Sequence, residues 1–141
     1  MIDLVIVNHK EKTIQIFDLK CVWAVENFLD EYYLYRRAYL QAYIYWRAIL
    51  NSEDIFSFDH SDYEVLYPKF IVCDSINYYN PLIYTLDEQD MTDAYEGFEY
   101  KGRQYIGLKE IIEDLKFALT ENVWNMSRKN YLSNGVVKLR G

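Results

Sequence analysis

The chain opens with alternating apolar and polar positions, the pattern of half-buried β-strands. Two stretches carry this pattern, Ile2–Val7 and Thr13–Lys20, and both are rich in β-branched residues. The segment between them, Asn8–Lys12, is polar and turn-like, so a hairpin is the expected connection. With His9–Lys12 as the loop, two residues face each other when their numbers add up to 21. This register predicts three facing pairs on one side of the sheet: Val7 with Ile14, Val5 with Ile16, and Asp3 with Asp18.

Helical spacing dominates the next part of the chain. Residues Asp30–Leu50 contain no glycine or proline, which predicts one long helix. Lys69–Asp74 and Leu82–Leu86 read as a second pair of strands. The other expected elements are a polar, acidic loop (Asn51–Asp62), a short helix starting at a capping box (Thr85–Glu88), an amphipathic helix (Leu108–Leu119), and a final strand (Val136–Leu139) after the Asn134–Gly135 turn.

This order of strands and helices predicts an α/β fold, of the α+β kind, with a mixed central sheet flanked by helices. The 141 residues are enough for one domain with a genuine core, so we expect a single domain over residues 1–141.

The facing carboxylates of Asp3 and Asp18 are the first candidate for chemistry. Like charges directly opposite each other in a sheet are destabilising. A divalent cation turns that repulsion into a binding site, since Mg²⁺ is typically held by one or two carboxylates and several waters. Lys20 lies on the same face, about 6.6 Å beyond Asp18 along the strand. The alternative is that these are ordinary solvated charges at a strand end, and a slip of one residue would move Asp3 to the other face.

The long helix carries two further sets of candidate residues. One stripe at helical spacing is apolar except for Gln41 and Tyr45 in its middle, and a buried amide needs partners, either structural ones or in a site. The stripe consists of Leu34, Ala38, Gln41, Tyr45 and Ala48. The opposite face interleaves basic and aromatic residues, which suits contact with nucleic acid, although exposed arginines lying along a surface are the commoner explanation. That face consists of Tyr32, Arg36, Tyr39, Tyr43 and Arg47.

Composition sets limits on these interpretations. The net charge of −7 is unfavourable for a simple phosphate-binding module, but carboxylates that hold metal and locally gathered basic residues would accommodate it. Cys21 and Cys73, without CxxC spacing, argue against a disulfide framework and against a zinc site. No apolar run is long enough to span a membrane, and the first residues do not form a signal peptide, so a cytoplasmic protein is the expectation.

Three motifs occur here in a fixed order: Asp3, then Asp18-Leu19-Lys20 at the end of a strand, then Gln41 to Tyr45 on a helix. This order of Asp, DxK and QxxxY resembles the PD-(D/E)xK nuclease superfamily, in particular its RecB-type and phage-exonuclease branch. The resemblance covers about the first third of the chain. It implies a restriction-endonuclease-like core and a Mg²⁺- or Mn²⁺-dependent deoxyribonuclease of phage or recombination type, expected to act as an exonuclease on DNA.

The resemblance also implies a role for each matching position. Asp3, Asp18 and the Leu19 carbonyl would be metal ligands, and Lys20 would be the catalytic lysine. Gln41 and Tyr45 would line the site beside the nucleic-acid backbone. Arg36 and Arg47, on the other helix face, are the further candidates for nucleic-acid contact.

The sequence departs from the family pattern at its start. The family usually brings another acid from a helix before the first strand, and a glycine three residues before the first Asp, and Asp3 is too close to the start of this chain for either. The chain is therefore expected to be N-terminally truncated relative to the family and to cleave DNA poorly without upstream sequence. Glu26 is the only substitute we identify for the missing acid. A sheet face left uncovered by the missing helix would favour self-association into a homo-oligomer.

Two alternatives remain at this stage. The chain could be a catalytically inactive nuclease-fold domain that binds DNA or serves as a scaffold, or a plain α+β interaction protein with accidental motifs. The most discriminating observation is whether the Asp3 and Asp18 carboxylates converge.

Overall fold

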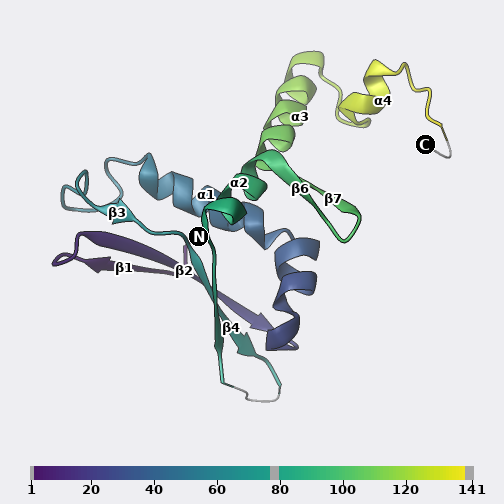
Figure 1. Cartoon of the computed structure of the whole chain (residues 1–141). Helices are drawn as coiled ribbons and strands as arrows, with labels where there is room; N and C mark the ends of the chain where they lie inside the picture. Colours follow the sequence, from purple (N-terminus) through teal and green to yellow (C-terminus); the bar gives the residue numbers. More distant parts are fainter. Residues whose placement is uncertain (1, 77–79, 139–141) are drawn as a thin grey trace. The chain divides into compact units, whose positions relative to one another are not determined.

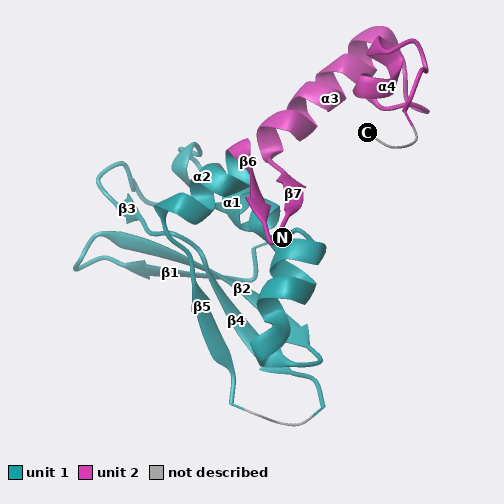
Figure 2. Ribbon diagram, turned by 45° about the vertical axis from the view of Figure 1, so that its right-hand side comes forward, with its two compact units in different colours: residues 1–95 teal, residues 96–141 magenta. Residues whose placement is uncertain are grey.

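The computed structural model describes residues 2–76 and 80–138. These residues divide into two compact units, residues 1–95 and residues 96–141, coloured separately in Figure 2. The expectation of a single domain stays a prediction, since compactness alone does not say which unit folds independently.

The first unit is built on a five-stranded mixed sheet. Its strands are β1 (Leu4–Asn8), β2 (Thr13–Val22), β3 (Glu64–Val65), β4 (Lys69–Asp74) and β5 (Leu82–Thr85). The order is β1-β2-β4-β5, and the short β3 also pairs with β2. β2 is parallel to β3 and β4, whereas the β1–β2 and β4–β5 pairs are antiparallel. The expected α+β class with a mixed central sheet flanked by helices is confirmed.

The register of the first hairpin is the one that the sequence predicts. Val7 pairs with Ile14 and Val5 pairs with Ile16. β1 itself begins at Leu4, so Asp3 lies one residue before the strand. β2 runs two residues further than expected, to Val22.

The two faces of the sheet differ in how far they are covered. On one face Ile14, Ile16 and Ile49 form a fully buried cluster, to which α1 (Ala38–Leu50) contributes Ile49. On the other face large apolar side chains remain open to solvent, Leu19 with 48% and Ile83 with 60% of their surface exposed. The candidate site therefore lies on the face that the helices cover.

The prediction of one continuous helix over Asp30–Leu50 is wrong, because the connection from β2 to β4 is interrupted. The connection consists of a 3₁₀ turn (Val25–Asn27), a π-helix η2 (Leu29–Tyr35) and then α1. The dark-blue helical segment before α1 and α1 itself run in different directions in Figure 1. The break falls at Arg37, which has a left-handed backbone with φ 57 and ψ 39. A straight helix over Asp30–Leu50 would be about 30 Å long, so the break lets both segments follow the twisted sheet.

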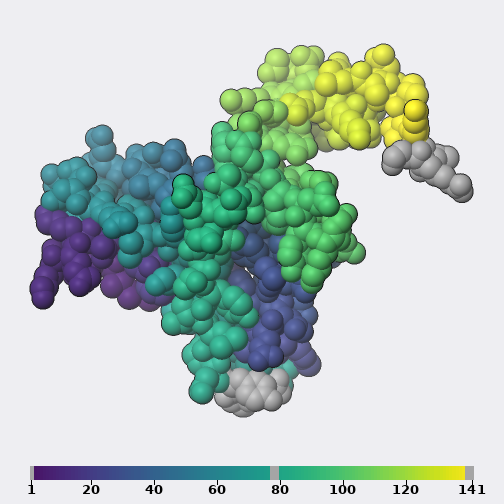
Figure 3. Space-filling view, viewed as in Figure 1, coloured from purple at the N-terminus to yellow at the C-terminus, as the bar shows by residue number. Residues whose placement is uncertain are grey.

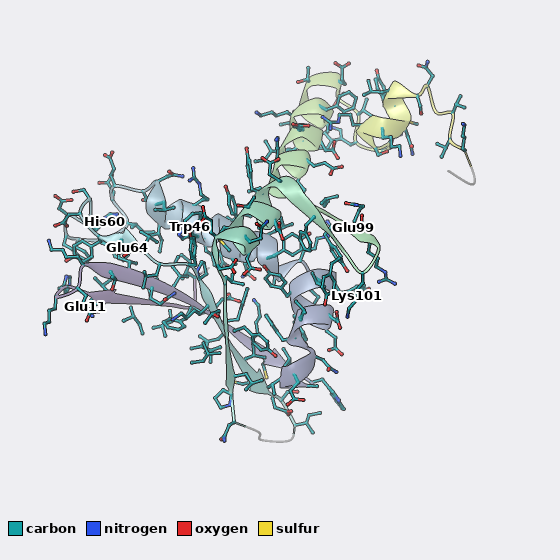
Figure 4. The ribbon with its side chains drawn as sticks, in the orientation of Figure 1. Glu11, Trp46, His60, Glu64, Glu99 and Lys101 are labelled. Atoms are coloured by element: carbon teal, nitrogen blue, oxygen red, sulfur yellow. The ribbon has the colours of Figure 1, made fainter. Side chains whose placement is uncertain are left out.

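The end of α1 and the loop after it are fastened to the sheet by side chains. Trp46, labelled in Figure 4, donates a hydrogen bond from Nε1 to the Val65 carbonyl over 3.2 Å. The acidic segment Asn51–Asp62 is a loop, as expected. It lies against the β1–β2 hairpin at the purple end of Figure 3, where Lys12 forms an ion pair with Asp62. These contacts fix the face of α1 that meets β2.

Helix α2 (Glu88–Glu96) begins with a capping box, two residues later than predicted. The Asp90 amide donates to Asp87 Oδ1 at 3.0 Å, and the Asp87 amide donates to Asp90 Oδ2 at 2.9 Å. Two aspartates thus take the places that Thr85 and Glu88 were expected to fill. In a capping box the second side chain belongs to the third residue of the helix, which is Asp90 here, so α2 begins at Glu88.

The second unit contains a hairpin that the sequence interpretation missed, formed by β6 (Gly97–Tyr100) and β7 (Arg103–Ile106), followed by α3 (Leu108–Glu121) and α4 (Arg128–Leu132). The predicted amphipathic helix is confirmed as α3. The predicted final strand is wrong for residues 136–138, and Leu139 lies outside the described residues. Asn134 and Gly135 instead end α4, where the Gly135 amide donates to the Asn130 carbonyl.

Two observations concern the cysteines and membranes. Cys21 and Cys73 are free thiols that face each other as register partners on β2 and β4. Among the helices described here, none has the length and apolar character needed to cross a bilayer.

Candidate functional site

The hairpin register brings Asp3 next to the end of β2. Asp3 Oδ2 accepts a hydrogen bond from the Leu19 amide over 2.9 Å, which holds this otherwise exposed side chain beside the strand. Asp18 points to the covered face and is only 3% exposed. Burial is the main cause of a raised pKa of Asp18, and the nearby Asp3 carboxylate raises that pKa further. The structure therefore brings the two predicted ligands together.

The charge of Asp18 is costly where it lies. Burial is the main cause that raises the pKa of Asp18, and the neighbouring Lys20 opposes it. Lys20 Nζ lies 2.5 Å from Asp18 Oδ2 as an ion pair. Among the described residues no other group donates to Oδ2, so the Lys20 ammonium is the partner of this buried oxygen. A metal ion at this oxygen would take the position that the Lys20 ammonium now holds.

Gln41, in the first turns of α1, connects the other members of the site. Its Oε1 accepts a hydrogen bond from Lys20 Nζ at 2.9 Å. Its Nε2 donates to Asp18 Oδ1 at 3.3 Å and to the Tyr45 hydroxyl at 2.8 Å. We call Asp3, Asp18, Lys20, Gln41 and Tyr45 the Asp18 cluster.

Tyr45 completes the cluster one turn further along α1. The hydrogen bond that Gln41 donates to the hydroxyl oxygen lowers the pKa of Tyr45. The same hydrogen bond fixes the orientation of the Gln41 amide, so that its oxygen faces Lys20 and its nitrogen faces the carboxylate. The position of the Lys20 ammonium is therefore set by two neighbours, a carboxylate and an oriented amide.

The basic and aromatic residues of the long helix do not form the single face that the sequence suggests. Tyr39 is fully buried in the core, and Tyr43 stacks on Tyr95. Arg36 lies over the ring of Tyr32, 4.5 Å from its centroid. The break at Arg37 changes the helical phase, which separates Arg36 from the exposed Arg47. Within the described residues neither arginine contacts the Asp18 cluster.

The donor set suits a hard divalent cation in part. In the described part of the chain, no group of three or more His, Cys, Asp or Glu side chains gathers as a metal site would. Two carboxylates are nevertheless what Mg²⁺ commonly takes from a protein, with water completing its shell. The carboxylates of Asp3 and Asp18 fit that requirement, with Lys20 now beside the Asp18 oxygen that the ion would take. In the part of the chain that the structure describes, Glu26 has no hydrogen bond or ion pair with the cluster, and the Leu19 carbonyl stays a predicted ligand.

A separate cavity of about 110 Å³ lies between η2, the sheet and α2. Phe28, Tyr33, Tyr84 and Asp90 are among the residues that line it. The polar groups that line it already have hydrogen-bond partners. The Tyr33 hydroxyl donates to Asp90 Oδ1 at 3.2 Å, and the other oxygen of Asp90 caps α2. No unsatisfied group points to a reaction there, so the Asp18 cluster is the stronger candidate.

The sequence did not reveal the left-handed backbone conformation of Arg37, because that conformation is usually marked by a glycine or an asparagine and not by an arginine. The sequence did predict the members of the Asp18 cluster, from strand alternation and helical spacing.

No protein family, no curated protein and no solved structure matches this chain. The likeness to the PD-(D/E)xK nucleases therefore stays a prediction made from three motifs.

Proposed function

We propose that this chain is a metal-dependent nuclease that hydrolyses phosphodiester bonds of DNA, with a restriction-endonuclease-like core and an exonuclease mode of action. The observation that supports this proposal best is the buried Asp18 carboxylate, which shares a cluster with Asp3, Lys20 and Gln41. A buried carboxylate costs stability, and a function that uses the charge explains its retention.

In this proposal Asp3 and Asp18 hold one Mg²⁺ or Mn²⁺ ion. When bound, such an ion lowers the pKa of a water ligand and polarises a phosphoryl oxygen. The two carboxylates fit this use, and the ion would take the position at Asp18 Oδ2 that the Lys20 ammonium now holds. The acidic net charge also favours a cation at this position.

Lys20 supplies the second element of the chemistry. Its ammonium stabilises the negative charge that develops on phosphate oxygens during attack, an effect that is strong where water is largely excluded. Gln41 keeps the ammonium in place through the 2.9 Å hydrogen bond to its side-chain oxygen. Tyr45 in turn holds the Gln41 amide in the orientation that this contact requires.

Calorimetric titration of Mn²⁺ into wild type and Asp18→Asn tests the metal site. We expect binding by wild type and none by Asp18→Asn, because asparagine keeps the shape and removes the charge. The matched control is Asp62→Asn, which changes an exposed aspartate in an ion pair with Lys12. Equal Mn²⁺ binding by all three proteins would overturn the assignment.

Digestion of linear DNA with Mg²⁺ or Mn²⁺ tests the reaction. We expect cleavage that disappears on chelation of the metal and in Asp18→Asn and Lys20→Ala, and that persists in Asp62→Asn. Metal binding without any cleavage would favour the alternative of a nuclease fold that only binds DNA.

A further inference from the structure

The polypeptide is irregular directly before the Asp18 cluster, at the junction of η2 and α1. Seven residues, Leu29–Tyr35, form a π-helix, and Arg37 then takes a left-handed conformation at φ 57 and ψ 39. Both features cost free energy relative to an α-helix, and an arginine gains nothing locally from φ above zero. Backbone outliers of this kind cluster where a protein contacts a ligand. Gln41 lies one helical turn after this break.

The side chains at the break are open to solvent. Tyr35 is 81% exposed. Arg37 is exposed as well, and its guanidinium has no ion pair or side-chain hydrogen bond within the described residues. Arg36 is held over the ring of Tyr32, 4.5 Å from its centroid, which leaves its charge without a carboxylate partner among those residues. We call Tyr35, Arg36 and Arg37 the Tyr35–Arg37 turn.

We propose that the Tyr35–Arg37 turn binds single-stranded DNA that enters the Asp18 cluster, with Arg37 on a phosphate and Tyr35 stacked on an unpaired base. This inference rests on the proposed nuclease function and specifies its substrate.

Charge complementarity supports this partner. The chain carries a net charge of −7, so a polyanion approaches it only where positive charge is concentrated. The charge of Lys20 is already opposed by Asp18. Arg36 and Arg37 are adjacent and exposed, have no such partner within residues 2–76 and 80–138, and lie about one turn before Gln41. A strand whose reacting phosphate lies at the cluster would continue past them.

The exposed ring decides between single and double strands. A tyrosine with most of its surface in water offers a face on which an unpaired base can stack, and base stacking on aromatic residues is a main source of affinity in single-strand binders. Bases in a duplex are already stacked on one another and offer no such face. The combination of an open ring with two arginines therefore fits an unpaired strand.

The test is fluorescence anisotropy with a labelled oligothymidine of about 12 nucleotides, within the range of single-strand site sizes. Measurements in EDTA across a series of salt concentrations prevent cleavage and separate binding from reaction. For Arg37→Gln we expect a weaker salt dependence, with the slope of log K against log salt reduced by about 0.7 for one lost phosphate contact. Arg37→Lys should keep the slope. Tyr35→Ser should lower affinity about fivefold or more with an unchanged slope.

The matched control is Arg103→Gln, which removes an exposed arginine of β7 in the other unit and should bind as wild type does. Circular dichroism melting verifies that each variant is folded. An Arg37→Gln slope equal to that of wild type overturns the inference, and so does a duplex of the same length that binds as tightly as the single strand. If binding depends on Arg37 while no metal-dependent cleavage is found, the nuclease proposal fails and the docking surface stands.

Discussion

Replacing Lys20 by methionine keeps the length of the side chain and removes the charge beside Asp18. Taking one partner from a buried ion pair costs about 3–5 kcal/mol, because the other charge stays buried without compensation. The side chains of Lys20 and Asp18 are 21% and 4% exposed, so the pair is mostly desolvated. Asp18 keeps the hydrogen bond from Gln41, which places the expected loss near the lower end, at about 3 kcal/mol. That is a large part of the stability of an ordinary domain.

The pH dependence of this loss follows from the pKa of Asp18. Burial raises that pKa above its ordinary value of 3.8, so the folded protein binds this proton more tightly than the unfolded chain. The stability from protonation is fully present below the unfolded pKa and is lost as pH rises through the folded pKa. Lys20 lowers the pKa, so its removal raises it further. The difference between Lys20→Met and wild type is therefore largest at neutral pH and shrinks in acid.

Urea unfolding at neutral and acidic pH measures this difference, and a double-mutant cycle with Asp18→Asn isolates the pair. We expect Lys20→Met to cost much less in the Asp18→Asn background, with a coupling free energy of about 2 kcal/mol. A coupling near zero, or a Lys20→Met deficit that is the same at both pH values, would refute the account of Asp18 as a buried charge that depends on Lys20.

Two further predictions follow from the geometry. Gln41→Ala should lower the turnover number for DNA cleavage more than Arg36→Ala does, because Gln41 positions Lys20 whereas Arg36 lies over Tyr32. Cleavage rates at saturating DNA and fixed salt measure this difference, and the reverse order would make the arginines the dominant contact with DNA. Gly97→Ala should destabilise the second unit by about 2–3 kcal/mol, since Gly97 has φ +89 and a Cβ there would meet backbone atoms at 2.9 Å. The control Gly102→Ala, at φ +72 with open space around it, should cost only about 1 kcal/mol in the same thermal melts, and equal costs would contradict the steric argument.

The sequence predicts the Asp18 cluster because local rules determine its parts. The loop His9–Lys12 sets the register, and alternation then places Asp18 and Lys20 on one face. Helical spacing places Gln41 and Tyr45 side by side on α1.

The break at Arg37 follows no local rule. No glycine or proline marks it, and it arises because η2 and α1 each bury their own residues, Tyr33 and Leu34 on one and Ala38 and Tyr39 on the other. Packing of the whole unit thus overrides local helix propensity. The same dependence explains the wrong final strand, since Val136 and Val137 are 75% and 60% exposed and pair with no strand in the described part of the chain.

The hairpin of β6 and β7 did have a local signal. Its turn residues Lys101 and Gly102 both have positive φ, at 48 and 72, as a tight two-residue hairpin requires. Glycine at the second position is the usual mark of such a turn, and alternating residues flank it on both sides.

The Asp18 cluster is drawn entirely from residues 3–45. Each of its hydrogen bonds joins residues that are near neighbours along the chain or belong to one hairpin and the next helix, so little chain must be ordered to form it. β4, the central parallel partner of β2, is supplied only from Lys69 onward and contributes no side chain to the cluster. The groups assigned to the chemistry thus form a low-contact-order assembly, while the larger sheet that supports it depends on pairing between distant segments, the slower kind of event in folding.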